Sequence, residues 1–204
     1  MSGRGLVLGL DADGVLLNYL SGLFAYARSQ GHRVACEPHE VTDWSCRNAF
    51  PDHDDDGIYR LIEEFSVTDG FSRIPPIEGA VEAVHAIKST LPDVSVVAIT
   101  SAGSSPLTIE MRRQNLELFP FDDVHVLPLG ASKAEHLSRL PKGSVFVDDL
   151  HKHVQAAESV GLHGVLFRQS YNAMHDHRLV ISGWDEGRDL VARLLSEPGL
   201  RLTA

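Results

Sequence analysis

Short apolar runs along the chain alternate with segments whose apolar residues have helical spacing. The apolar runs are residues 6–10, 94–99, 124–127, 145–147 and 164–167. The segments with helical spacing are residues 79–90, 106–119, 133–140, 151–160 and 186–195. Short runs rich in β-branched residues are typical of strands buried on both faces. The alternation therefore predicts an α/β fold, a doubly wound parallel sheet of five strands with helices on both faces.

Residues 18–75 interrupt this alternation. They contain two helical patterns, at 19–30 and 57–65, but no run that indicates a core strand. The insertion leaves just after the first strand, at the edge where such sheets bind ligands, so we expect a small helical cap over that site. The predicted domains are a Rossmann-like α/β core of residues 1–17 and 76–204 and a small helical cap of residues 18–75.

Composition and charge narrow the classes of function. A chain of 204 residues with 43% hydrophobic and 23% charged residues is expected to form one main domain. Its net charge of −10 disfavours a nucleic acid polymer or an anionic membrane as partner, because either would be repelled. A small anionic substrate remains compatible if a divalent metal held by carboxylates attracts it.

Cysteine usage and the start of the chain bear on zinc and on compartment. Cys36 and Cys46 are the only cysteines, and neither lies in a spacing typical of zinc sites. We find no signal-peptide pattern at the start and no apolar stretch of membrane-spanning length. The expected compartment is the cytoplasm, with reduced thiols, and the sequence leaves open a monomer or a homodimer.

Polar side chains follow the predicted strands where each strand ends. They are Asp11 and Asp13 after the first, Thr100 and Ser101 after the second, and Asp148 and Asp149 after the fourth, with Lys133 starting the helix before the fourth. Parallel strands end at one edge of the sheet, so these groups should converge. Carboxylates, a hydroxyl and an ammonium group suit phosphoryl transfer through an aspartyl-phosphate, with Mg²⁺ held by oxygen ligands.

Four segments in order are similar to the motifs of the haloacid dehalogenase (HAD) superfamily, and they span almost the whole chain. They are Asp11-Ala-Asp13-Gly-Val-Leu, Ile-Thr100-Ser101, Lys133 and Val-Phe-Val-Asp148-Asp149. The resemblance implies a magnesium-dependent phosphatase, a phosphoric monoester hydrolase with Asp11 as nucleophile. It also implies that Asp13 protonates the leaving oxygen and later deprotonates the hydrolytic water.

The same resemblance assigns binding roles. Thr100 or Ser101 would donate hydrogen bonds to the phosphoryl oxygens, and Lys133 would balance charge between nucleophile and phosphate. The implied metal ligands are Asp11, the main-chain carbonyl of Asp13, and Asp148 and Asp149, either directly or through water.

Each motif also has a simpler interpretation. Asp-x-Asp-Gly alone is often a turn, and Thr100 or Ser101 could cap the following helix. Lys133 could be a solvated surface lysine, with Lys142 as the competing candidate, although Pro141-Lys142-Gly143 is typical of an exposed turn. A receiver domain uses similar residue types, but its acidic pair precedes the lysine instead of following it.

The insertion bears on the substrate. Thr42-Asp43-Trp44, Phe65, Gly70-Phe71 and the segment 76–84 are similar to the 5'(3')-deoxyribonucleotidases, whereas Leu17-Asn18-Tyr19 and Ala102-Gly103 depart from them. The aromatic residues Trp44, Phe50, Phe65 and Phe71 could stack on a base, but a core for the cap is the favoured interpretation. A small phosphorylated metabolite is expected, with a (deoxy)nucleoside monophosphate as one candidate. A sugar-phosphate phosphatase, a phosphotransferase and a non-catalytic HAD-like binding or regulatory protein are the alternatives.

Two further polar clusters are weighed separately. The acidic run 52–56 is interpreted as a solvated loop that starts the helix at Gly57, in preference to a second metal site. His151 and His153 are expected on the outer surface of a helix, with His151 near enough in sequence to approach the metal.

Overall fold

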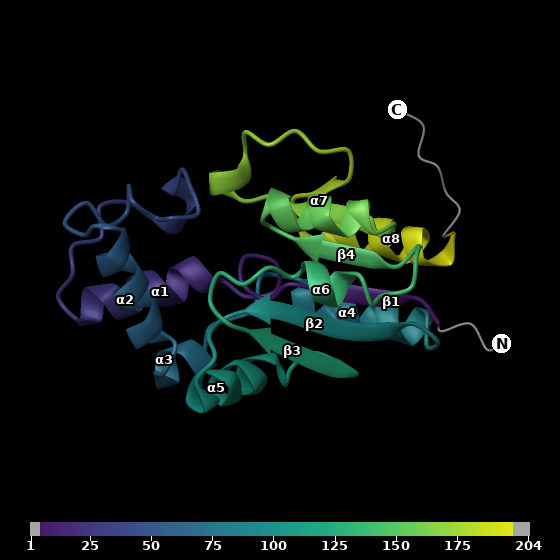
Figure 1. The fold of residues 1–204 in the computed structure, drawn as a ribbon, viewed down its shortest axis with the longest axis horizontal. Helices are drawn as coiled ribbons and strands as arrows, with labels where there is room; N and C mark the ends of the chain where they lie inside the picture. The colour runs from purple at the N-terminus through teal and green to yellow at the C-terminus, as the bar shows by residue number, and fades with distance from the viewer. Residues whose placement is uncertain (1–4, 198–204) are drawn as a thin grey trace.

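Figure 1 shows a computed structural model of the protein, which describes residues 5–197. Residues 1–4 and 198–204 of the predicted core domain lie outside the described residues. Within the described part, six parallel strands form one sheet in the order β3-β2-β1-β4-β5-β6. The strands are β1 (Val7–Leu10), β2 (Ser95–Ser101), β3 (Asp123–Leu127), β4 (Val145–Asp148), β5 (His163–Phe167) and β6 (Val180–Ile181). This order confirms the predicted doubly wound sheet. The chain adds strands toward one edge from β1 to β3 and toward the other edge from β4 to β6, and such sheets bind ligands at the switch between β1 and β4.

Helices cover both faces of the sheet, as the alternation predicted. They are α4 (Ala80–Thr90) and α8 (Trp184–Ser196) on one face, α6 (Ala134–Leu137) and α7 (His151–Ser159) on the other, and α5 (Pro106–Leu116) beside β3. Successive residues of β1 alternate between the two faces. Leu8 and Leu10 pack in the cluster that contains residues of α4 and α8, whereas Val7 packs with Leu137 of α6 and Ala157 of α7.

The insertion after β1 lies beyond the end of the sheet to which the arrowhead of β2 points (Figure 1). Its helices are α1 (Tyr19–Ser29), the short 3₁₀ helix η1 (Pro38–Glu40), α2 (Asp55–Phe65) and α3 (Asp69–Ser72). Phe50, Phe65 and Phe71 are buried, and the rings of Phe65 and Phe71 meet edge to face with centroids 5.5 Å apart. These three residues are core residues, as expected, but they belong to a hydrophobic cluster that continues into the sheet, whereas Trp44 is 65% exposed. We propose that residues 18–75 act as the cap.

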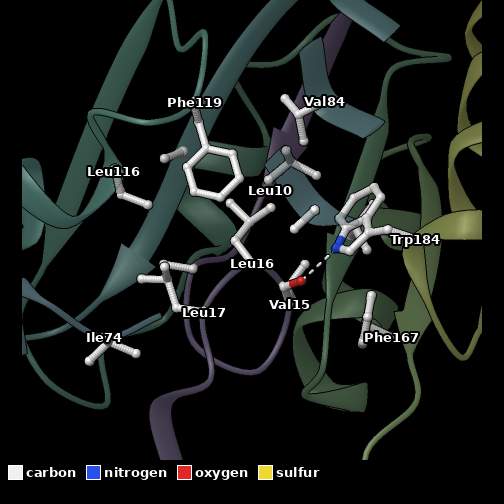
Figure 2. Packing of buried hydrophobic residues seen from close by; sticks show 14 of the residues in the cluster. Leu10, Val15, Leu16, Leu17, Ile74, Val84, Leu116, Phe119, Phe167 and Trp184 are labelled. Carbon is white, nitrogen blue, oxygen red and sulfur yellow. Dashed lines mark hydrogen bonds between the residues drawn. The ribbon is translucent and has the colours of Figure 1, made fainter. Parts of the chain in front are cut away.

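The loop after β1 is anchored in the hydrophobic core. Figure 2 shows Val15, Leu16 and Leu17 among the buried side chains, and the Trp184 indole of α8 donates a 2.8 Å hydrogen bond to the carbonyl of Val15. Packing of the three apolar residues and this hydrogen bond fix the backbone next to Asp11.

Among the departures from the sequence expectation are one strand and two helix ends. Strand β6 is a sixth strand, and its two residues, Val180 and Ile181, are too few to show a pattern. Helices α5 and α6 end earlier than the helical spacing indicated, at Leu116 and Leu137. Prolines follow at 120 and 141, and a residue before proline disfavours helical geometry. No helix among residues 5–197 is long and apolar enough to cross a membrane.

Candidate active site

A tight turn at the end of β1 holds Asp11 at the edge of the sheet. The Asp11 amide donates to the Val147 carbonyl of β4 at 3.0 Å, and the Asp11 carboxylate accepts from the Ala12 amide at 2.8 Å. Gly14 adopts a left-handed φ of 73°, which favours glycine. A Cβ added at Gly14 would lie 2.5 Å from the Tyr171 hydroxyl oxygen, so this position has no room for a side chain.

Lys133 joins two of the carboxylates that the sequence singled out. Its Nζ lies 2.7 Å from Asp11 Oδ1 and 2.7 Å from Asp148 Oδ2, and all three side chains are buried. Burial alone would lower the pKa of Lys133, but Asp11 and Asp148 together raise that pKa above its ordinary value. The ammonium group is therefore held charged between them. Lys142, the competing lysine, lies exposed in the turn before β4.

Asp149 is held by residues of the segment after β5. The Tyr171 hydroxyl donates to the Asp149 carboxylate, and the Asn172 side-chain amide donates to the Asp149 carbonyl at 2.8 Å. Burial and then the neighbouring Asp148 raise the pKa of Asp149 well above its ordinary value. Tyr171 was missed by the sequence analysis. Its signal was available, because Ser170-Tyr171-Asn172 follows β5 as the other polar groups follow their strands.

Three carboxylates form a cluster that could hold a metal ion. One oxygen from each of Asp11, Asp148 and Asp149 lies within 4.8 Å of the others, and all three residues are buried. The pKa of Asp148 is raised to about 6, because burial and the charge of Asp11 outweigh the opposing effect of Lys133. Crowded, buried carboxylate oxygens with too little compensating positive charge are a donor set that fits a hard divalent cation such as Mg²⁺.

Thr100 and Ser101 end β2 beside this cluster. Thr100 Oγ1 is buried and, among the residues that the structure describes, has no hydrogen-bond partner. Ser101 Oγ donates to the Ala131 carbonyl at 3.3 Å. Neither residue caps α5, because Ser105 does so by accepting from the Thr108 amide at 3.0 Å. The helix-cap interpretation of Thr100 and Ser101 was therefore wrong, and the Thr100 hydroxyl is left available to a ligand.

Asp13 pairs with an arginine that the sequence analysis did not single out. Nη2 of Arg112, on α5, lies 2.7 Å from Asp13 Oδ1 and 2.6 Å from Oδ2. Burial raises the pKa of Asp13 above its ordinary value although Arg112 acts in the opposite direction. The local sequence does not distinguish Arg112 from the adjacent Arg113, which the structure places in an exposed position.

A cavity of about 620 Å³ opens onto these groups. Asp11, Asp13, Thr100 and Lys133 line it from the sheet, and the insertion contributes Tyr19, Trp44, Ile62 and Phe71. The cavity thus lies between the strand ends and the insertion, and its size suits a small organic ligand.

The remaining polar clusters fall outside or beside the cavity. His153 is buried and lines the cavity, and burial followed by the charge of Lys133 lowers its pKa to about 4. Its predicted place on the outer surface was wrong, because His153 lies on the side of α7 that faces the core.

His151 is half-buried, and its ring stacks on that of His175 with centroids 4.8 Å apart. Asp54 caps α2 by accepting from the Gly57 amide at 2.8 Å, so the acidic run starts the helix as predicted, although the helix begins at Asp55 and not at Gly57.

Comparison with known proteins places the chain in a family. Residues 5–195 match the model of the 5' nucleotidase, deoxy (pyrimidine), cytosolic type C protein family. No curated protein matched the sequence.

Solved structures with this fold are numerous and distant in sequence. A haloacid dehalogenase-like hydrolase from Xanthomonas campestris is 18% identical with a TM-score of 0.55, over 98% of this chain and 96% of that one. A predicted phosphoglycolate phosphatase from Haemophilus somnus is 16% identical with a TM-score of 0.60, over 93% and 99%. A HAD hydrolase from Bacillus subtilis, bound to magnesium, is 13% identical with a TM-score of 0.56, over 92% and 99%.

The family match covers nearly all of the described residues, and the fold is similar to that of these hydrolases. The chain therefore belongs to the family of 5' nucleotidase, deoxy (pyrimidine), cytosolic type C proteins and is a phosphatase of the haloacid dehalogenase superfamily.

Proposed function

We propose that this phosphatase hydrolyses a small phosphomonoester through an aspartyl-phosphate on Asp11 and requires Mg²⁺. The observation that carries the proposal is the buried contact of Lys133 with Asp11 and Asp148, beside Asp149 and at the floor of a cavity. A carboxylate that faces a cavity next to a fixed cation can accept a phosphoryl group without repelling it.

In the first step, an Asp11 carboxylate oxygen forms a bond to phosphorus as the bond from phosphorus to the ester oxygen breaks. The leaving alkoxide takes a proton from Asp13, which lines the same cavity. In the second step, water attacks the phosphorus of the aspartyl-phosphate and gives a proton to Asp13, so Asp11 is released as a carboxylate and inorganic phosphate leaves. Both steps balance without a further reactant.

Three other groups support the phosphoryl oxygens in this scheme. The Thr100 hydroxyl lacks a protein partner among the described residues, and Lys133 supplies a fixed positive charge. Ser101 lines the cavity and is proposed to assist. Asp11, Asp148, Asp149 and the Asp13 carbonyl would hold the metal, which when bound offsets negative charge on the transferring group.

For the substrate class we propose a (deoxy)nucleoside monophosphate. Trp44 lines the cavity with 65% of its surface exposed, and Lys152 Nζ of α7 lies 5.3 Å from the centroid of its ring. An indole presented at the mouth of a phosphate-binding cavity offers a surface on which a base can stack. The match to a nucleotidase family supports the same class.

The test is phosphate release from nucleoside monophosphates, deoxynucleoside monophosphates and sugar phosphates, with Mg²⁺ or with chelator. Release that needs Mg²⁺, favours nucleotides and disappears in Asp11→Asn is expected. Preference for sugar phosphates would refute the substrate class, and an active Asp11→Asn variant would refute the nucleophile. Addition of an acceptor alcohol distinguishes hydrolysis from transfer, because a phosphotransferase would form a new ester.

A further inference from the structure

Arg112 is a buried cation that the proposed steps do not use. Its side chain is 0% exposed, although it carries a full positive charge on α5. Nε of Arg112 has no hydrogen-bond partner among the described residues, and an incompletely paired buried charge costs stability. A hydrophobic residue at this position would avoid that cost, so stabilisation of the fold does not explain the arginine.

Its guanidinium is fixed from two sides. Toward the site, Nη2 lies within 2.7 Å of both carboxylate oxygens of Asp13, which restricts the position of that carboxylate. Toward the insertion, Cζ of Arg112 lies 4.4 Å from the centroid of the Phe71 ring of α3. A cation over a desolvated aromatic ring is attracted to it, so the Phe71 ring holds the guanidinium in place.

Neighbouring contacts tie the same helix to the insertion. Nη1 of Arg112 donates to Asn115 Oδ1 at 3.2 Å, and the Asn115 amide donates to the Ile74 carbonyl at 3.3 Å. Ser66, which directly follows α2, and Thr108 of α5 are hydrogen-bonded through their hydroxyls at 3.2 Å. The position of Asp13 is therefore linked, through Arg112 and α5, to the position of the proposed cap.

We propose that Arg112 is a positioning residue that orients the Asp13 carboxylate for proton transfer when the cap is packed against α5. This inference rests on the proposed role of Asp13. The insertion would then have a second role besides covering the cavity. Its Phe71 ring contacts Arg112 directly, and its Ile74 carbonyl accepts from Asn115, which in turn contacts Arg112. A small displacement of a proton donor lowers the rate strongly, since proton transfer requires close and aligned groups.

The test compares two substrates that differ in their need for a proton. Alkoxide leaving from a nucleoside monophosphate needs a proton donor, whereas p-nitrophenolate leaves from p-nitrophenyl phosphate without one. Because hydrolysis of the aspartyl-phosphate also uses Asp13 and is common to both substrates, the rate to measure is that of the first step, as release of the leaving group in a single turnover. Arg112→Met is expected to lower this rate for the nucleotide by about 100-fold and to change it little for p-nitrophenyl phosphate, with substrate affinity nearly unchanged. Arg112→Lys keeps the charge but lacks the planar guanidinium that Asn115 and the Phe71 ring hold in place, so an intermediate loss with the same selectivity is expected.

Two controls make the result specific. Arg113→Met removes the exposed neighbouring arginine on the same helix and should leave both activities unchanged. Asp13→Asn should show the same selectivity between substrates as Arg112→Met, and the double variant should show no further loss of selectivity. If Arg112→Met does not fold, as judged by circular dichroism, Arg112→Lys and Phe71→Leu carry the test with the same expected selectivity.

An equal loss for both substrates in the Arg112 and Phe71 variants, with a selective loss in Asp13→Asn, would overturn the positioning role and leave the proposed function intact. An Asp13→Asn variant without selectivity would overturn the proposed role of Asp13 and this inference with it.

Discussion

The buried carboxylate cluster predicts that, without metal, the protein loses stability as the pH rises. The pKa of Asp148 in the folded protein is about 6, against an ordinary value of 3.8. Between these two pKa values the Asp148 carboxyl group is ionised in the unfolded chain but still protonated in the folded protein, so protonation favours the folded state. The contribution is complete below about pH 4, is lost progressively toward pH 6, and is absent above that.

The size of the effect follows from the shift. A rise in the pKa of Asp148 from 3.8 to about 6 corresponds to about 3 kcal/mol in the free energy of unfolding. In a domain of this length that amounts to a fall in Tm of about 6–12 °C between pH 4 and pH 7 from this group. Mg²⁺ at 100 times its Kd should raise the free energy of unfolding at pH 7 by about 2.7 kcal/mol, because it binds only the folded cluster.

The assay is thermal unfolding followed by circular dichroism in chelator, at several pH values and constant ionic strength. Asp149→Asn is the matched variant, because it removes one crowded charge while its side-chain oxygen can still accept from Tyr171. The variant should be more stable than the wild type at pH 7 in chelator and should gain little from Mg²⁺. A wild-type stability that stays level or rises from pH 4 to 7, with no gain in the variant, would refute this reasoning.

Three further predictions concern single positions. Lys133→Met should lower kcat for every phosphomonoester by at least about 100-fold, because it removes the cation that contacts the nucleophile; steady-state kinetics with folded protein would measure this. Gly14→Ala should lower both Tm and activity, since the added Cβ would lie 2.5 Å from the Tyr171 hydroxyl, and an unchanged Tm would contradict the tight turn. Trp44→Ala should raise KM for nucleotides by about tenfold but not KM for p-nitrophenyl phosphate, whereas Leu118→Ala, which removes another exposed apolar side chain, should change neither.

The strands that carry the site could be predicted because they are buried on both faces. Leu8, Val97 and Phe146 each lie in continuous apolar runs, and such runs are visible without knowledge of their partners. Strand β6 was missed because its two residues pair only with β5, and that pairing leaves no trace in the local pattern.

The candidate site could be predicted only where its residues follow a strand. Asp11 and Asp148 stand directly at strand ends, and parallel packing is enough to bring those ends together. Arg112 lies on a helix 99 residues from Asp13 along the chain, so the pair arises from tertiary packing alone. His153 was assigned to the wrong side of its helix because the polar residue type outweighed the helical spacing, which places it with buried Val154 and Ala157.

The covalent step on Asp11 is the central claim, and chemical trapping tests it most directly. During turnover of a nucleoside monophosphate with Mg²⁺, borohydride would reduce an aspartyl-phosphate to homoserine, which peptide mass spectrometry can locate. Conversion at position 11 that requires substrate and is absent in Asp11→Asn is the predicted result. Steady turnover with no conversion at position 11, or conversion at another carboxylate, would contradict the account.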